Sequence, residues 1–135
     1  MKRKRCSFLA LLVLAVMLLM PATTQAAAKP GTVKLSSIKA TDYNKINIKW
    51  KKASGATNYI VYYKKAGSSK WIKVKTLDNT KSSYTHTSSK KYPIVVGQKY
   101  QYTVKAYNKK TKTSGRYNKT GLTTRTIPQT VKLTS

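Results

Sequence analysis

Acidic residues are almost absent from this chain of 135 residues, which has 28 Lys and Arg but only two acids, Asp42 and Asp78. It also contains one histidine, His86, and one cysteine, Cys6. The aspartates lie in the turn contexts TDYN and LDNT, where a short acceptor side chain bonds its own backbone, and His86 shares a strand face with Tyr84. One histidine and two separated acids do not supply the groups that catalysis, zinc or calcium require. We therefore expect a protein that is not an enzyme and holds no cofactor.

The single cysteine lies in an N-terminal segment that is typical of a secretory signal peptide. Basic residues 2–5 precede an apolar run of 13 residues, 8–20, and small residues that suit signal-peptidase cleavage follow Pro21. The run is shorter than the roughly 18 to 20 residues that span a bilayer. We therefore expect residues 1–28 to be cleaved, so that residues 29–135 are secreted or extracellular, with no thiol and no integral membrane span.

The mature chain is expected to be strongly basic. Cleavage would remove four basic residues and no acid, which leaves 24 Lys and Arg against two aspartates and a formal charge of +22. Of these 24 residues, 22 are lysines. Such a balance bears on solubility and on partners rather than on the fold.

Beyond residue 30, β-branched or aromatic residues alternate with lysine, threonine or asparagine, a pattern that is typical of half-buried strands. In KINIKWK, for example, Ile46, Ile48 and Trp50 point to one side, and the polar residues point to the other. In residues 71–77 the pattern leaves open whether the even-numbered or the odd-numbered residues face inward. Seven such segments in about 100 residues predict an all-β chain folded as a two-sheet sandwich. They span residues 32–38, 45–51, 59–64, 71–77, 82–87, 99–108 and part of 117–127.

The order and spacing of the aromatic residues resemble those of a fibronectin type III domain. The second predicted strand ends in Trp50, the third has the form Tyr-x-Val-x-Tyr, and IVVGQKY has the family's apolar-x-x-Gly-x-x-Tyr spacing up to Tyr100. The resemblance covers about residues 30–128, and it implies a seven-stranded immunoglobulin-like β-sandwich formed by one domain, residues 29–135. It also implies that Tyr100 is a tyrosine corner, with its ring in the core and its hydroxyl bonded to nearby backbone. The implied core residues are Trp50, Tyr59, Val61, Tyr63, Ile94, Tyr100, Tyr102, Val104 and Ala106.

The lysines are the remaining functional signal. In the fibronectin type III family the third, fourth and sixth strands share one sheet, so the resemblance implies one basic face there, formed by Lys64, Lys73, Lys75 and Lys105. Ordinary surfaces mix both signs of charge, so a surface nearly free of acids favours binding of a polyanion. Lysine lacks the planar fork of arginine, which favours salt-sensitive attachment to a phosphate polymer over base-specific reading. The candidate polyanion-binding residues are Lys64, Lys73, Lys75, Lys105, Lys109, Lys110 and Lys112.

The high lysine content and the short loops without acids resemble domains of secreted and cell-surface proteins from Gram-positive bacteria. We expect an exported, non-catalytic binding or adhesion module that associates with the cell envelope or matrix as a monomer. The expected partner is an anionic cell-wall polymer, with teichoic acid first. Anionic lipid head groups and non-specific binding of nucleic acid, such as extracellular DNA, are the other polyanion candidates.

Two alternatives of a different kind stay open. The chain has ten tyrosines, and those outside the inferred core could stack on sugar rings. The candidate glycan-stacking residues are Tyr62, Tyr107 and Tyr117, with Tyr92 and Trp71 as further candidates. The other alternative is a passive spacer module that works beside a separate extracellular enzyme or adhesin.

Overall fold

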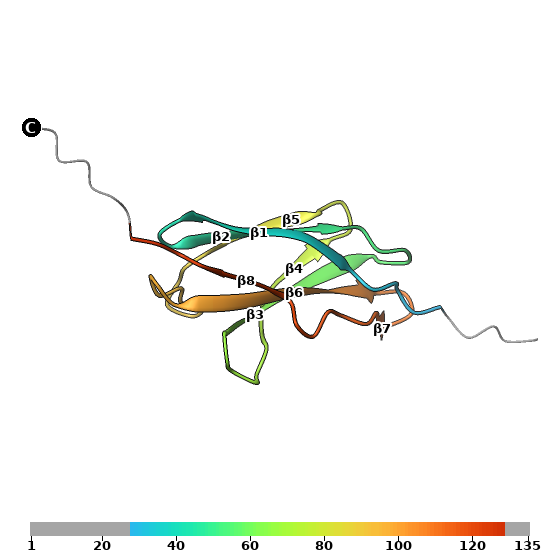
Figure 1. Cartoon of the computed structure of the whole chain (residues 1–135). Coiled ribbons are helices and arrows are strands. Elements are labelled where there is room, and N and C mark those ends of the chain that lie inside the picture. Colours follow the sequence, from blue (N-terminus) through green and yellow to red (C-terminus); the bar gives the residue numbers. More distant parts are fainter. Residues whose placement is uncertain (1–27, 129–135) are drawn as a thin grey trace, which may run out of the picture.

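The structure, a computed structural model, describes residues 28–128 of the chain (Figure 1). The predicted signal peptide, residues 1–28, therefore lies outside the described residues except for Ala28. Within the described range the chain forms eight β-strands and no helix, as expected for an all-β protein.

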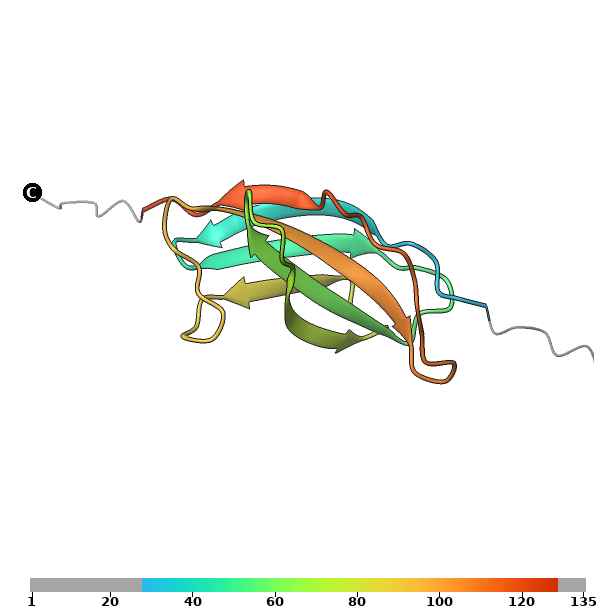
Figure 2. The same ribbon diagram turned by 90° about the horizontal axis from the view of Figure 1, so that it is seen from below.

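Two antiparallel sheets face each other across the core (Figure 1). The smaller sheet has the order β1-β2-β5, with β1 at Lys34–Asp42, β2 at Lys45–Lys51 and β5 at Ser83–Thr87. In the larger sheet β3 (Asn58–Lys65) lies between β4 (Ile72–Asp78) and β6 (Lys99–Asn108), and both β7 (Thr113–Ser114) and β8 (Leu122–Arg125) pair with β6. Figure 2 looks onto the larger sheet and shows β3 and β6 side by side. The first and last described residues lie at opposite ends of the sandwich (Figure 1).

The last strand of the sandwich is split into two pieces. β8 lies within the predicted segment 117–127, but β7 falls in the loop KKTKTSG, for which the sequence predicts no strand. That prediction is wrong. Because β6 is longer than β8, β8 pairs only with the first four residues of β6, and the last two residues of β6 pair with β7. The two pieces together occupy the place of one seventh strand, so the architecture is the predicted sandwich.

The core lies between the sheets and is built mainly from alternate residues of the strands. In β2, Ile46, Ile48 and Trp50 are buried, whereas Lys49 and Lys51 are exposed. Burying one large apolar side chain contributes about 1.5–3 kcal/mol, so this alternation drives the two sheets together. The buried hydrophobic residues include all nine that the resemblance implies, namely Trp50, Tyr59, Val61, Tyr63, Ile94, Tyr100, Tyr102, Val104 and Ala106.

His86 is buried in this core, and both of its ring nitrogens are hydrogen-bonded. Nε2 lies 3.1 Å from the carbonyl oxygen of Tyr92, which can only accept, so Nε2 carries the proton. Nδ1 therefore accepts a hydrogen bond from the hydroxyl of Tyr102 at 2.7 Å. The ring of Tyr63 packs edge-on against the imidazole, with ring centroids 4.8 Å apart. Burial lowers the pKa of His86 and raises the pKa of Tyr102, so both groups are neutral at pH 7 and act as structural groups.

Tyr100 has the geometry of the tyrosine corner that the resemblance implies. Its side chain is buried, and its hydroxyl accepts a hydrogen bond from the backbone N–H of Val95 at 2.9 Å. The N–H of Ile94 donates to Oγ of Ser88 at 2.8 Å, and the bond from His86 to the backbone of Tyr92 adds a third tie. These bonds fix the loop 88–98 against one end of the sandwich.

A β-bulge in β4 decides the orientation that the sequence leaves open. Tyr62 on β3 pairs with Lys73, but the preceding residue, Val61, pairs with Lys75, so Val74 is the extra residue. Directly opposite residues share a face of the sheet. Lys73 therefore lies on the outer face with Tyr62, whereas Lys75 lies on the side of the buried Val61. Because of the bulge, the residues on the core side are even-numbered at the start of β4 and odd-numbered after Val74. Neither orientation that the sequence leaves open for residues 71–77 therefore holds along the whole strand.

Candidate polyanion-binding site

The two acids leave most of the lysines without an anionic partner. Asp42 lies 3.8 Å from the amino group of Lys45, which is the one contact of a basic side chain with a carboxylate within 4.0 Å among residues 28–128. Asp78 accepts hydrogen bonds from the hydroxyl and the backbone N–H of Thr80, and these bonds hold the pKa of its carboxyl below the usual value. Both carboxylates serve turns, so lysine sets the electrostatic potential over the described surface.

Three of the four lysines that are expected on one sheet lie on its outer face. Lys64 follows Tyr62 by two residues on β3, Lys73 is opposite Tyr62, and Lys105 on β6 is opposite Ile60. Residues 60, 62 and 64 alternate with the buried side chains of β3, so these neighbours all point away from the core. The bulge places Lys75 on the other side of β4, and the expectation that all four lysines share one face is therefore wrong for Lys75.

The loop lysines lie at the opposite end of the larger sheet from the start of β6. Lys109, Lys110 and Lys112 follow β6 in the turn to β7, and all three are exposed. Tyr107 lies at this same end, opposite Asn58 and Ser114. β6 has ten residues, so these groups are roughly 30 Å from its first residue. The candidate lysines therefore do not form a single patch.

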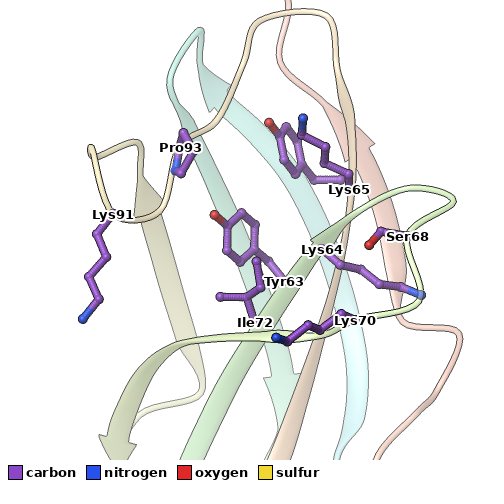
Figure 3. Close-up of a pocket in the computed structure, with 9 residues that line it drawn as sticks. Tyr63, Lys64, Lys65, Ser68, Lys70, Ile72, Lys91 and Pro93 are labelled. Atoms are coloured by element: carbon purple, nitrogen blue, oxygen red, sulfur yellow. The ribbon is translucent and has the colours of Figure 1, made fainter.

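A cleft of about 240 Å³ opens at one end of the sandwich, beside the turn after β3 and the loop 88–98 (Figure 3). Figure 3 shows Tyr63 in the middle, Lys91 and Pro93 on one side, and the turn that carries Ser68 on the other. Four of the lining residues are lysines and none is an acid. Ile72 in its floor keeps 43% of its surface exposed, so the floor is apolar and open. We call this hollow the end cleft; it is lined by Tyr63, Lys64, Lys65, Ser68, Lys70, Ile72, Lys91, Pro93 and Tyr100.

Backbone geometry positions both walls of the end cleft. In the turn after β3, Gly67 has a φ of 86°, and the N–H of Ser68 donates to the carbonyl of Lys65 at 3.0 Å. The opposite wall is the loop 88–98, which the bonds of His86, Ser88 and Tyr100 hold in place. The lysine side chains therefore project from a fixed frame.

Three lysines of the end cleft are not singled out by the sequence analysis. Lys65 and Lys70 lie at the two ends of the connection between the predicted strands 59–64 and 71–77. A hairpin brings the two ends of its connection together, so the sequence does contain a signal for this pair. Lys91 belongs to the loop beyond β5, and only the packing of the two sheets brings it to the same hollow. No local pattern in the sequence indicates that third contact.

A second hollow, of about 140 Å³, lies on the outer face of the larger sheet. The amino group of Lys64 is 4.8 Å from the centroid of the Trp71 ring, and that of Lys105 is 5.9 Å from the centroid of Tyr117. Both distances are typical of cation–π contacts. We call this hollow the outer pocket; it is lined by Tyr62, Trp71, Lys105 and Tyr117, so two of the three candidate stacking tyrosines meet there.

Gly121 allows the segment between β7 and β8 to lie against the outer pocket. It has a φ of 66°, and a Cβ atom there would collide with the carbonyl oxygen of Tyr102 and lie 3.1 Å from Cη2 of Trp71. We predict that Gly121→Ala lowers the free energy of unfolding by about 3 kcal/mol, because the left-handed backbone and the collision both oppose a side chain. Urea unfolding followed by tryptophan fluorescence measures this loss.

Gly67→Ala is the matched control for this substitution. Gly67 also has a positive φ, but no atom lies within 4 Å of the position that its Cβ would take. It should therefore lose only the cost of the left-handed conformation, about 1–2 kcal/mol. Equal losses for the two variants would contradict the close packing of Gly121 against Tyr102 and Trp71.

Comparisons with known proteins identify the architecture. No family model matches the chain, and no curated protein matches its sequence. Among solved structures, the FN5 domain of Drosophila Lar has a TM-score of 0.56 at 16% identity, over 74% of this chain and 99% of that one. An fn3 domain of human contactin 1 has a TM-score of 0.60 at 13% identity, over 87% of this chain and 96% of that one. The chain has the fibronectin type III fold.

A third similar structure is a bacterial enzyme that contains this fold as a small part. The beta-1,2-glucanase from Parabacteroides distasonis has a TM-score of 0.60 at 22% identity, over 82% of this chain but only 15% of the enzyme chain. All three identities are below 25%, so these likenesses establish the fibronectin type III fold and not a ligand.

Within residues 28–128, no group of three or more His, Cys, Asp or Glu side chains is placed so that it could hold a metal ion. None of the described residues forms a helix long and apolar enough to cross a bilayer. The candidate binding features of this chain are its lysines, the end cleft and the outer pocket.

Proposed function

We propose that this protein is an exported, non-catalytic binding module that attaches to anionic polymers of a Gram-positive envelope or matrix through its lysine-rich surface. It acts as a monomer, and teichoic acid is its preferred partner. The observation that carries the proposal is the end cleft, where Lys64, Lys65, Lys70 and Lys91 surround an apolar floor and no acid lines the hollow.

The chemistry of the end cleft suits a flexible phosphate polymer. Four lysines line one hollow that no acid lines, so the positive potential there attracts an anion. Lysine presents a hydrated point charge rather than a rigid fork, so it accepts phosphate groups at variable spacing. Tyr63 and Ile72 in the floor, together with Pro93 in the wall, can cover the carbon backbone of the polymer between its charges.

We predict that residues 29–135 bind purified teichoic acid and lose roughly 50-fold in affinity between 50 and 200 mM salt, as about four phosphate contacts would give. Replacing Lys64, Lys65, Lys70 and Lys91 with glutamine should remove most of this salt dependence and most of the affinity. The binding constant is measured by calorimetry across a salt series, with duplex DNA and a neutral wall polysaccharide as comparison ligands.

A second quadruple variant provides the control for charge. Lys34, Lys39, Lys49 and Lys51 are exposed on the smaller sheet, and replacing them with glutamine removes the same net charge away from the end cleft. This control should retain most of the affinity. Equal losses in the two variants would mean that a uniform positive coat binds the polymer, which contradicts a role of the end cleft. Salt-insensitive binding to the neutral polysaccharide would overturn the proposed function.

A further inference from the structure

The outer pocket gathers aromatic rings from three separate parts of the chain. Tyr62 comes from β3, Trp71 directly precedes β4, and Tyr117 lies between β7 and β8. All three side chains are half-buried, yet about 140 Å³ between them and Lys105 is left unfilled. Ligand sites are concave, lined largely by apolar and aromatic side chains, and furnished with a few polar groups. The outer pocket has the properties of a ligand site.

The size and polarity of the outer pocket indicate the class of ligand. Its volume is close to that of an engineered cavity of about 150 Å³ that holds benzene, so it suits one six-membered ring. The phenol hydroxyls of Tyr62 and Tyr117 and the amino group of Lys105 supply polar partners around that ring. Burial and the neighbouring Tyr117 raise the pKa of Tyr62, so its hydroxyl remains a neutral donor.

A pyranose ring matches this combination of surfaces. Its C–H groups form apolar faces that pack on aromatic rings, and its hydroxyls point outward around the rim. The ammonium groups of Lys64 and Lys105 lie over the rings of Trp71 and Tyr117, so positive charge is present next to the aromatic surfaces. A sugar that carries an acidic group therefore fits better than a neutral sugar.

The outer pocket and the end cleft are adjacent through two residues. Lys64 lines the end cleft, and its amino group also lies over Trp71, which lines the outer pocket. Trp71 is followed directly by Ile72 in the floor of the end cleft. The two hollows lie on opposite faces of the β3–β4 hairpin, because Tyr62 points outward and Tyr63 is buried, so one polymer chain contacts both by passing around the hairpin at Lys64.

We propose that the outer pocket binds one pyranose ring of an acidic polysaccharide, whose neighbouring anionic groups lie on the lysines of the end cleft. This inference rests on the proposed function, because the same lysines hold the charged part of the polymer. It adds a residue-level site, formed by Tyr62, Trp71, Lys105 and Tyr117, that distinguishes a sugar-containing polyanion from a polyanion without rings.

The test compares probes that share charge but differ in ring content. Purified protein is titrated with a galacturonate hexamer, with a polyphosphate of equal charge, with neutral maltohexaose and with single-stranded DNA. Trp71→Ala should weaken galacturonate binding about tenfold, the effect of one lost stacking contact, and change polyphosphate binding less than twofold. Tyr117→Ala should show the same pattern. Because Trp50 is only 3% exposed, a change in tryptophan emission with galacturonate reports on Trp71.

Tyr43→Ala is the matched control, since Tyr43 is 42% exposed in the turn between β1 and β2. It should leave binding of every probe unchanged, and circular dichroism checks that each variant is folded. Equal weakening of galacturonate and polyphosphate by Trp71→Ala would overturn the inference and leave the proposed function standing. A loss confined to single-stranded DNA would do the same, whereas maltohexaose binding as tightly as galacturonate would overturn both proposals. Failure of the unaltered protein to bind either polyanion would overturn both proposals.

Discussion

Replacing Tyr100 with alanine should lower the free energy of unfolding by about 3–5 kcal/mol, the usual cost of removing a large aromatic side chain from a core. Tyr100 is 1% exposed, and its ring stacks on Tyr63 with centroids 5.9 Å apart. Its hydroxyl accepts the N–H of Val95 at 2.9 Å. Alanine would therefore leave a cavity beside Tyr63 and a backbone N–H without its partner. Urea unfolding followed by tryptophan fluorescence measures the change.

Two other tyrosine substitutions separate the ring from the hydroxyl. Tyr100→Phe keeps the ring but removes the acceptor for Val95, so it should cost about 1–2 kcal/mol. Tyr43→Ala removes an exposed tyrosine and should change the free energy of unfolding by less than about 0.5 kcal/mol. If Tyr100→Ala were as mild as Tyr43→Ala, the ring of Tyr100 would not belong to the core.

Tyr100 also connects the fold to the proposed binding site. It lines the end cleft, and its hydroxyl holds the loop that carries Lys91 and Pro93. Weakening this tie should therefore move one wall of the cleft even where the sandwich stays folded. A lysine-lined hollow on a fixed frame is easier to bind than the same lysines on free loops, because less side-chain and backbone freedom is lost on binding.

The fold follows from the sequence where alternation is uninterrupted. In β2, Ile46, Ile48 and Trp50 are buried as their spacing predicts, and Tyr100 takes the position that its distance from Gly97 implies. These features depend on the two-residue period of a strand, which is a local property. Local patterns therefore predict the strands and the sandwich.

The features that depend on pairing between strands do not follow from the sequence. The bulge in β4 turns Lys75 to the other side of the sheet, and nothing in IKVKTLD marks Val74 as the extra residue. β7 is a strand only because the end of β6 offers it a partner. The same limit applies to the candidate site, since Lys91 joins Lys64 in the end cleft through the packing of two sheets.

Lowering the pH from 7.5 to 4.5 should destabilise the fold through one residue, His86. It is 1% exposed, and burial lowers its pKa below the ordinary value of 6.5. The titratable groups packed against its ring are the phenols of Tyr63, Tyr92 and Tyr102, and burial raises the pKa of Tyr63 and of Tyr102. Protonation would bury a charge among these rings, and Nδ1 would no longer accept the hydrogen bond from Tyr102.

The direction of the effect follows from the two protonation states. The folded chain has the lower histidine pKa, so the unfolded chain binds more protons once the pH falls below about 6.5. The free energy of unfolding should be constant from pH 8 to about 7 and then decrease, with a slope that approaches about 1.4 kcal/mol per pH unit. Asp78 contributes at lower pH, because its pKa lies below the ordinary value of 3.8.

His86→Gln tests whether this residue accounts for the pH dependence. Glutamine keeps an amide that can donate to the carbonyl of Tyr92 but loses the edge-on contact with Tyr63, so the variant should be less stable at pH 7.5. Its free energy of unfolding should then stay flat from pH 7.5 to 5, because residues 29–135 contain no other histidine and no glutamate or cysteine. Urea unfolding of both proteins is measured at one ionic strength, because the formal charge of +22 makes stability sensitive to salt. A flat curve for the unaltered protein, or an equal slope in the variant, would show that protonation of His86 does not limit stability.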